Sequence, residues 1–273
     1  MSRTVIQGSG GSGSNSVFNN NFATGTFGTG KVMTYGAGSY SFVVPSGISS
    51  VRVRMWGAGG CGANSVSSYT GGGGGGFALK VIEGLSSGDS ILITVGAAAT
   101  SPNSAGSGGT SSFGSYVSAT GGQNAVSTNS SRVGGVGTGG DINFAGGSSY
   151  AGGNGGGGGA ASLFGNGGNG WAIYPFPNSG GADGGFSFGT TKQDNLRSAK
   201  NGFGYGGYDY TSLAQYAQPI TNIDLIGTGQ GGRVIYESGI NGGGGSHGGS
   251  GGFPGGGGGS YALGSDGLLI VEY

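Results

Sequence analysis

The residue types that could do chemistry are scarce in this chain, and the two most reactive types occur once each. His247 follows Ser246 in the segment GGGGSHGGS, and Cys61 follows the segment WGAGG. A Ser–His hydrolase needs a histidine that packed structure holds and a carboxylate orients, and a glycine tract supplies neither. One Cys and one His also cannot build a disulfide framework, a Cys/His zinc site or a Cys–His pair within one chain. We therefore interpret His247 as exposed or at the edge of a glycine-rich structure, and Cys61 as a free thiol without a catalytic role.

A phosphate-binding loop is the closest match to a nucleotide motif, and it is incomplete. Residues 25–32 read GTFGTGKV, whereas the P-loop requires Ser or Thr after the Gly-Lys pair. Val32 lacks the hydroxyl that would bind Mg²⁺, and no helical pattern follows. Matches to the dinucleotide pattern GxGxxG carry no weight, because a chain so rich in glycine contains several by chance. We interpret Lys31 as a solvated residue at the start of a strand.

Carboxylates are sparse in the middle of the chain, where they are Asp183, Asp194, Asp209, Asp224 and Glu237. They form neither a calcium loop of the EF-hand type nor a GGxGxD repeat. A glycosidase needs a placed pair of carboxylates, and no spacing here singles out such a pair. We therefore expect a protein that is not an enzyme, with no catalytic residues, no metal site and no cofactor. A lone bound ion is left open.

Aromatic side chains between glycine runs are the remaining candidates for function. They alternate with Gly, Ser and Asn, a composition that gives binding loops a large contact area at a low cost in side-chain entropy. The alternative is that the rings pack on one another or on the glycine-rich structure as small cores. We expect at least one exposed contact patch from this set. The candidate receptor-binding residues are Trp171, Tyr174, Phe176, Phe186, Phe188, Phe203, Tyr205, Tyr208, Tyr210 and Tyr236.

Composition excludes several classes of protein. Of 273 residues 76 are glycine, but there are only six prolines and no strict G-X-Y period, so the chain is not a collagen. Ten basic residues balance ten acidic ones and charged residues make up 7%, which argues against binding to nucleic acid or anionic lipid. Intrinsic disorder needs high net charge and few aromatics, whereas the net charge is zero and aromatics make up 10%. The sequence therefore predicts an ordered protein.

Period-two alternation of apolar residues predicts strands and an all-β fold. Residues 51–56 show this alternation. One face of the predicted strand has Val51, Val53 and Met55, and the other face has Arg52 and Arg54, as in a half-buried antiparallel strand. We expect a small antiparallel β-sandwich-like scaffold. The predicted strands cover residues 39–45, 51–56, 77–83, 89–95, a weaker stretch around 113–117, and 268–273.

The chain leaves this scaffold after residue 120 and returns to it near residue 259. Long glycine runs between these points have almost no side chains to bury, so hydrophobic burial cannot offset their backbone entropy. Extended glycine chains can instead bond side by side in a polyglycine-II lattice; a floppy linker is the alternative. We predict the lattice, because linkers seldom contain segments such as WAIYPFP and GFGYGGYDY. The predicted units are an N-terminal arm for virion attachment or oligomerisation (1–38), the scaffold (39–120 plus 259–273) and the glycine-rich insertion with aromatic display loops (121–258).

Several blocks together resemble the glycine-rich domain of bacteriophage tail-fibre and tail-tip proteins. The segment SYSFVVPSGISSVRVRMWGAGGCG is similar to its opening strand, turn and second strand, and GGGGGGFALKVIEGLSSGDSILITVGAA to its next glycine run and strands. The segments GGTSSFGSYVSATGG and GSDGLLIVEY resemble its later elements. The resemblance covers about residues 39–120 and 259–273. Its departures are Cys61 and the segment AAATSPNSAGS, which we expect to lie in loops.

The resemblance implies a bacteriophage virion protein, a tail-fibre or tail-tip adhesin that binds a host cell-surface receptor, either a protein or a glycan. The alternative is a purely structural virion component, a head decoration or fibre-connecting protein without receptor binding. The implied partners are other virion proteins, through the N-terminal arm, and the host receptor. By analogy with fibres we expect a homo-oligomer, with a trimer plausible and a single capping copy left open.

Localisation follows from the apolar segments. The first residues, MSRTVIQGSGGSGSN, have no apolar run after Arg3, so we expect no signal peptide. The longest apolar runs, such as ILITV and LLIV, are far shorter than the roughly 20 residues that span a bilayer, so we expect no membrane insertion. Such a protein suits assembly in the host cytoplasm and release in a virion, in its tail or a fibre.

Overall fold

The computed structural model describes residues 27–63, 70–126, 132–150, 155–170, 239, 242–245 and 248–273. These residues contain strands but no helix, and so none that could cross a bilayer. The strands are β1 (Val32–Tyr35), β2 (Gly38–Val43), β3 (Ser50–Trp56), β4 (Phe77–Glu83), β5 (Ser90–Val95), β6 (Ser111–Phe113), β7 (Val117–Ala119), β8 (Gly137–Thr138), β9 (Ile142–Phe144) and β10 (Leu268–Glu272).

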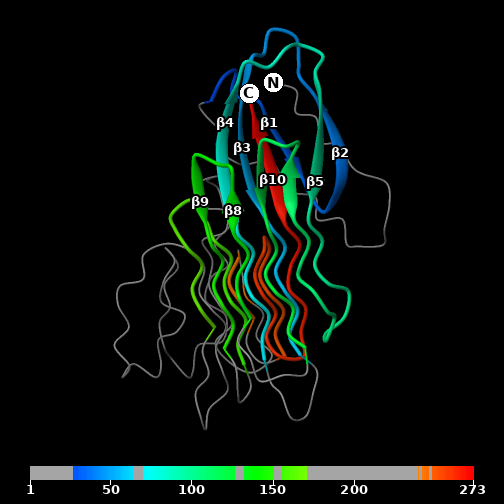
Figure 1. The fold of residues 1–273 in the computed structure, drawn as a ribbon, viewed down its shortest axis with the longest axis vertical. Helices are drawn as coiled ribbons and strands as arrows, with labels where there is room; N and C mark the ends of the chain where they lie inside the picture. Colours follow the sequence, from blue (N-terminus) through cyan, green and yellow to red (C-terminus); the bar gives the residue numbers. More distant parts are fainter. Residues whose placement is uncertain are drawn as a thin grey trace.

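The strands form two antiparallel sheets of five strands, which confirms the all-β prediction. The first sheet has the order β1-β10-β3-β4-β9 and the second the order β2-β5-β6-β7-β8. Both lie at one end of the molecule, and glycine tracts continue from them along its longest axis (Figure 1). The last strand of the chain, β10, is inserted between β1 and β3, so residues at the two ends of the described chain share one sheet.

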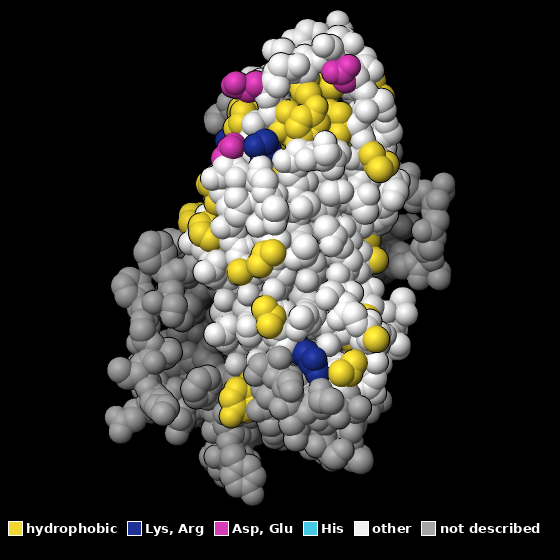
Figure 2. All heavy atoms as spheres, in the orientation of Figure 1, with side chains coloured by type: hydrophobic (Ala, Val, Ile, Leu, Met, Phe, Trp, Pro, Cys, Tyr) yellow, Lys and Arg dark blue, Asp and Glu magenta, His cyan; other side chains and the backbone are white. Residues whose placement is uncertain are grey.

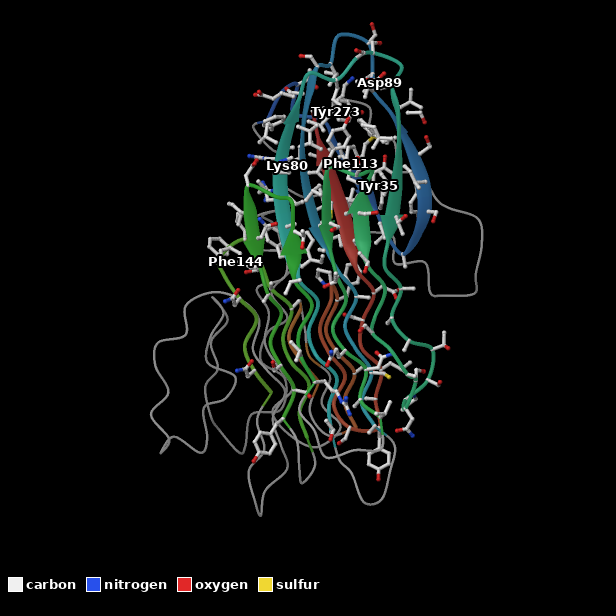
Figure 3. All side chains as sticks on the ribbon, viewed as in Figure 1. Tyr35, Lys80, Asp89, Phe113, Phe144 and Tyr273 are labelled. Carbon is white, nitrogen blue, oxygen red and sulfur yellow. The ribbon has the colours of Figure 1, made fainter. Side chains whose placement is uncertain are left out.

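The hydrophobic core lies between the two sheets. Alternation along β3 turns Val53 inward, where it is fully buried, and β2 contributes Phe42. The Phe42 ring lies 5.7 Å from the ring of Phe113 and 5.8 Å from that of Tyr273, centroid to centroid. Figure 3 shows Phe113, Tyr273 and Tyr35 gathered between the strands of the two sheets. This aromatic cluster joins β2 and β6 of the second sheet to the last residue of the chain, which follows β10 of the first sheet.

The outer face of the first sheet is more buried than the sequence predicts. Arg52 and Arg54 do point away from the core, but only 3% of the Arg54 side chain is exposed. Both guanidinium groups bind the carboxylate of Glu272, which is buried on the neighbouring strand β10, and the Arg54 Nε atom lies 2.9 Å from its Oε1 atom. The prediction of a solvent-facing arginine was wrong for Arg54, because an ion pair across the strands lets this face be covered.

A second apolar cluster attaches the first sheet to the glycine tracts. Trp56 and Phe77, at the ends of β3 and β4, are fully buried, and their rings lie 4.9 Å apart. They pack against Ala160 and Ala161 of a glycine tract. The indole N–H of Trp56 donates a hydrogen bond of 2.9 Å to the carbonyl oxygen of Ala161. A large ring with one polar atom thus fixes the tract against the sheet.

The remaining differences from the predicted strands are local. The single strand predicted around residues 113–117 is a hairpin, β6–β7, whose turn begins at Gly114 with a φ of +51°. Three short strands, β1, β8 and β9, were not predicted. Because β1 pairs with β10, the first sheet includes residues 32–35, which the sequence assigns to the N-terminal arm.

Candidate functional site

Glycine tracts continue directly from the strands and form a second layer of structure. Residues 57–63 follow β3 without a break, and residues 70–76 lead into β4. Figure 1 shows these tracts running side by side away from the sheets. None of them belongs to a sheet, yet their backbone groups are hydrogen-bonded from tract to tract.

The hydrogen bonds of residues 71–76 repeat with a period of three. The N–H of Gly72 donates to the carbonyl of Gly258 (2.8 Å), and the N–H of Gly75 donates to the carbonyl of Gly255 (2.7 Å). Residues three apart therefore bond to the same neighbouring tract, as in a polyglycine-II or polyproline-II helix with three residues per turn. The residues between them point to other tracts. This is the bonding of the predicted lattice.

Residues 71–76 are at the centre of that lattice. Their backbone groups bond to six other tracts, which contain residues 57–60, 120–123, 135, 147, 158–161 and 255–258. A Cβ atom added at any of the six glycines would lie only 1.9–2.5 Å from backbone of another tract. No side chain fits on any face, which explains why GGGGGG, the longest glycine run of the sequence, stands here.

The tract of residues 57–63 shows how a side chain is accommodated. A Cβ atom on Gly59 or Gly62 would lie 2.0 Å from a carbonyl oxygen of residues 256–259. Ala58 and Cys61 also lie three residues apart and share a different face of the helix. Their side chains are fully buried, so this face has room for small groups. The lattice therefore includes tracts from the predicted scaffold range (39–120) as well as from the predicted insertion.

Cys61 is a free thiol, as predicted, but it does not lie in a loop. It is fully buried, and its backbone N–H donates a 3.0 Å hydrogen bond to the Oδ1 atom of Asn124. Burial raises the pKa of the Cys61 thiol, and hydrogen bonds with Ser104 and Asn103 partly oppose that rise. Asn103 also donates from its backbone N–H to the carbonyl of Gly62 (3.2 Å). Cys61 thus contacts the segment that contains Asn103 and Ser104. These are the two places where the sequence departs from the resemblance to the phage family.

One end of the molecule holds both Phe27 and the C-terminal residue, Tyr273. The Thr29 hydroxyl donates to the carbonyl oxygen of Tyr273 (2.6 Å), and the Lys31 N–H donates to the same oxygen (3.0 Å). The C-terminus lies at the sheet end, opposite the glycine lattice (Figure 1). A Cβ atom on Gly28 would lie 2.6 Å from the carbonyl carbon of Tyr273, so this approach requires glycine. The segment before Phe27 therefore joins the molecule at its sheet end.

The predicted aromatic site lies outside the described residues, as does His247, and its flanking residues are members of the lattice. Gly167 donates to the carbonyl of Ala145 (2.8 Å), which follows β9, and Gly170 donates to that of Ser148 (2.8 Å), farther from the sheets. On the other side, Gly239 donates to the carbonyl of Ser250 (2.8 Å). Lattice glycines thus flank the aromatic segment on both sides, and Gly170, the last described residue before it, lies far from the sheets. The site candidates outside the described residues are Trp171, Tyr174, Phe176, Phe186, Phe188, Phe203, Tyr205, Tyr208, Tyr210 and Tyr236.

Sequence reasoning missed two exposed side chains near the same end of the lattice. Val133 is 57% exposed and Tyr150 is 39% exposed. The backbone N–H of Ser149 donates to the carbonyl of Arg132 (2.8 Å), so both residues flank one contact between tracts. Neither residue belongs to an aromatic-rich segment, which is the signal that selected the other candidates. A lone ring two residues before a glycine run, as in YAGG (150–153), is the sequence feature that could have identified Tyr150.

Charged side chains are few on the described surface and do not gather into a reactive site. Lys80 and Asp141 form an ion pair of 3.8 Å beside the first sheet. Figure 2 shows that the large central area of one face has scattered apolar atoms and hardly any charged side chain. Within the described residues, no group of three His, Cys, Asp or Glu side chains lies close enough to hold a metal ion.

Comparison with known proteins identifies the family of the chain. The family model of the glycine-rich domain matches residues 33–273, a range that runs from β1 through the lattice to the last residue after β10. No curated protein matches the chain. The matched range contains both sheets and all the tracts around residues 71–76, so the chain belongs to the glycine-rich domain family.

Proposed function

We propose that this protein is a bacteriophage virion protein, a non-enzymatic tail-fibre or tail-tip adhesin that binds a protein or glycan on the host cell surface. The observation that carries this proposal is the polarity of the molecule. The segment before Phe27 joins at the sheet end, whereas Gly170, the last described residue before the aromatic-rich segment, lies far from that end. An adhesin needs this arrangement, with attachment at one end and a contact surface at the other.

The lattice supports the proposal because it is a stiff base for binding segments. Residues 71–76 bond to six tracts without any side chain, so the sequences that connect the tracts are free to differ in composition. Anchoring both ends of a binding segment reduces the conformational entropy that binding must remove. Tyr and Trp then supply contact area with few rotatable bonds.

The two ends of the molecule suggest a separate binding place for each partner. We propose that the N-terminal arm binds another virion protein or a neighbouring copy at the sheet end, and that the host receptor binds at the lattice end. Deletion of residues 1–26 is expected to abolish incorporation into particles while both sheets still fold, because this deletion leaves β1 and the contacts of Thr29 and Lys31 intact. Normal incorporation of the deleted protein would contradict this part of the proposal.

Binding of the purified protein to intact susceptible bacteria tests receptor recognition. The variant replaces Trp171, Tyr174, Tyr205 and Tyr208 with alanine. Its matched control is Tyr116→Ala, which removes a ring that is 42% exposed in the turn between β6 and β7. We expect the control to bind like the wild type and the fourfold variant, with an unchanged melting temperature, to lose binding. Equal binding by all three proteins would show that these rings do not contact the receptor.

A purely structural virion role is the second candidate, and the lattice itself favours it. A body held by backbone hydrogen bonds between many tracts is suited to decorating a head or connecting fibre segments even without a receptor. If the wild-type protein in its native assembly does not bind susceptible cells, the structural role is favoured over the adhesin.

A further inference from the structure

The open edge of the second sheet is β2, and it differs from the other edge strands. It has six residues, whereas the edge strands β1, β8 and β9 have four, two and three. The edges formed by β8 and β9 are joined by a bridge between Val136 and Ala145. Proteins usually protect edge strands by shortness, charge, proline or a bulge. Residues 36–44 have no charged residue and no proline, and their pairing with β5 is continuous.

Alternation along the strand determines which backbone groups of β2 are open. The N–H of Val44 donates to the carbonyl of Asp89 (2.9 Å), so residues 38, 40 and 42 bond to β5 in the same way. Leu92, which pairs with Ser41, accepts a hydrogen bond from Gly114 on the opposite side (2.7 Å). The N–H and C=O groups of Ser39, Ser41 and Val43 therefore point away from the sheet.

These outward groups have no hydrogen-bond partner among the described residues, and the side chains beside them are accessible. Ser39 and Ser41 are exposed, and Val43 is 57% exposed. Leu92 on the adjacent strand is 62% exposed on the same face. Three donors and three acceptors in an extended row match another extended strand and no other common element of structure.

We propose that β2 pairs with β2 of a second copy of this chain, antiparallel, to form one continuous sheet of ten strands. The open row is symmetric about Ser41, so a two-fold axis there pairs Ser41 with Ser41 of the second copy. The same axis pairs Ser39 with Val43 of the second copy, and all six open groups of each copy are then bonded. A strand without charge can meet itself in this way without repulsion.

This pairing has a definite geometry and does not rest on the proposed function. Antiparallel strands run in opposite directions, so the two glycine lattices lie at opposite ends of the dimer. The outer faces of the two second sheets lie on the same side, and each Val43 gains a cross-strand neighbour. An assembly in which all copies point the same way requires a different interface, and the experiment distinguishes the two.

Oligomeric state in solution, measured by sedimentation equilibrium on the full chain, tests the pairing. We expect a dimer for the wild type and a monomer for Ser41→Pro, because proline removes an outward N–H that makes no bond within the protomer. Ser41→Ala is the matched control: it loses the 2.7 Å hydroxyl contact with Ser90, keeps the N–H, and is expected to remain a dimer. If Ser41→Pro fails to fold, Val43→Lys replaces it, since a charge at this exposed position also blocks the edge.

Cross-linking tests the register. In a Cys61→Ala background, Ser41→Cys is expected to form an intermolecular disulfide, because Cα atoms of a hydrogen-bonded pair lie about 5.5 Å apart. Ser39→Cys is the control and is expected not to cross-link, because the two copies of residue 39 are separated by four residues, about 13 Å along the strands. A monomeric wild type, an oligomer that Ser41→Pro leaves intact, or cross-linking through residue 39 would overturn the proposal.

Discussion

Substitution of Gly74 by alanine tests whether the lattice depends on the absence of side chains. The added Cβ atom would lie 1.9 Å from the carbonyl oxygen of Gly159, and contacts below 3.0 Å are essentially not found for real Cβ atoms. The tract that contains Gly159 would have to move by at least about 1 Å. The obstacle is backbone, so no rotation of a side chain can relieve the contact.

The size of the effect follows from the bonds that such a shift would lengthen. Gly158 donates to Gly72 and Ala161 donates to Gly75, each at 2.9 Å, and Gly159 accepts from Gly147 at 2.8 Å. Loss of two or three of these buried bonds, at about 1–3 kcal/mol each, gives a decrease of about 3–6 kcal/mol in the free energy of unfolding. For a domain of this size that corresponds to a melting temperature lower by roughly 10–20 °C.

The matched control is Gly36→Ala, between β1 and β2. A Cβ atom at Gly36 would meet nothing within 4 Å, and its φ does not lie in the left-handed region. This substitution is expected to be neutral or to stabilise by about 0.4–1 kcal/mol, because alanine reduces the entropy of the unfolded chain. Thermal melts followed by circular dichroism, with urea titrations of the same proteins, measure both effects.

A melting temperature of Gly74→Ala within about 2 °C of that of Gly36→Ala would contradict close packing at Gly74. That result would mean that tracts separate by an ångström without losing hydrogen bonds, and that the lattice is not close-packed around residues 71–76. A large decrease in both variants would instead indicate that loss of any glycine is harmful, whatever its surroundings.

Three further predictions concern the sheets and the buried thiol. Glu272→Gln removes the carboxylate that Arg54 contacts at 2.9 Å, and we expect it to lower the free energy of unfolding by about 3 kcal/mol in urea titrations; a loss below about 1 kcal/mol would contradict this. Burial raises the pKa of Tyr35 from 10.0 to about 12, so the unfolded chain loses this proton first, and stability falls as pH rises from 10 to 12. Urea titrations across this range should show a decrease of up to about 2–3 kcal/mol that is clearly smaller in Tyr35→Phe, where the raised pKa of Tyr273 still contributes, and retained in Tyr116→Phe. Cys61, fully buried, should react with a thiol reagent at least on the order of a thousandfold more slowly in the native protein than in urea, and equal rates would refute its burial.

Most strands of the sheets were predictable from the sequence. Apolar and polar residues alternate along a strand whose two faces have different surroundings, and this alternation is visible in the sequence. The predicted range 77–83 coincides with β4, and 51–56 lies within β3. The strands that escaped prediction, such as β8 with two residues, are too short to show a period. Burial of Arg54 could not be foreseen, because it depends on Glu272, which is 218 positions away and reaches Arg54 only through the pairing of β10 with β3.

The lattice was predictable in kind from the entropy of glycine runs, but its membership was not. A glycine run indicates that side chains do not fit at those positions. It does not indicate which neighbouring tract packs against them. The sequence alone therefore could not show that residues 57–63 and 70–76, assigned to the scaffold, bond with residues 158–161 and 255–258. The proposed contact residues from Trp171 to Tyr236 stay predictions, since composition selected them and the described residues do not include them.

The direction of the glycine tracts has a mechanical consequence. The tracts run along the longest axis of the molecule and continue directly into β3 and β4, while the hydrogen bonds between them run across that axis (Figure 1). A pull between the two ends therefore loads these bonds in shear, so that many must break together, instead of opening one at a time as in a zipper. A body of this kind can transmit tension along its length although its individual tracts have almost no side chains to hold them.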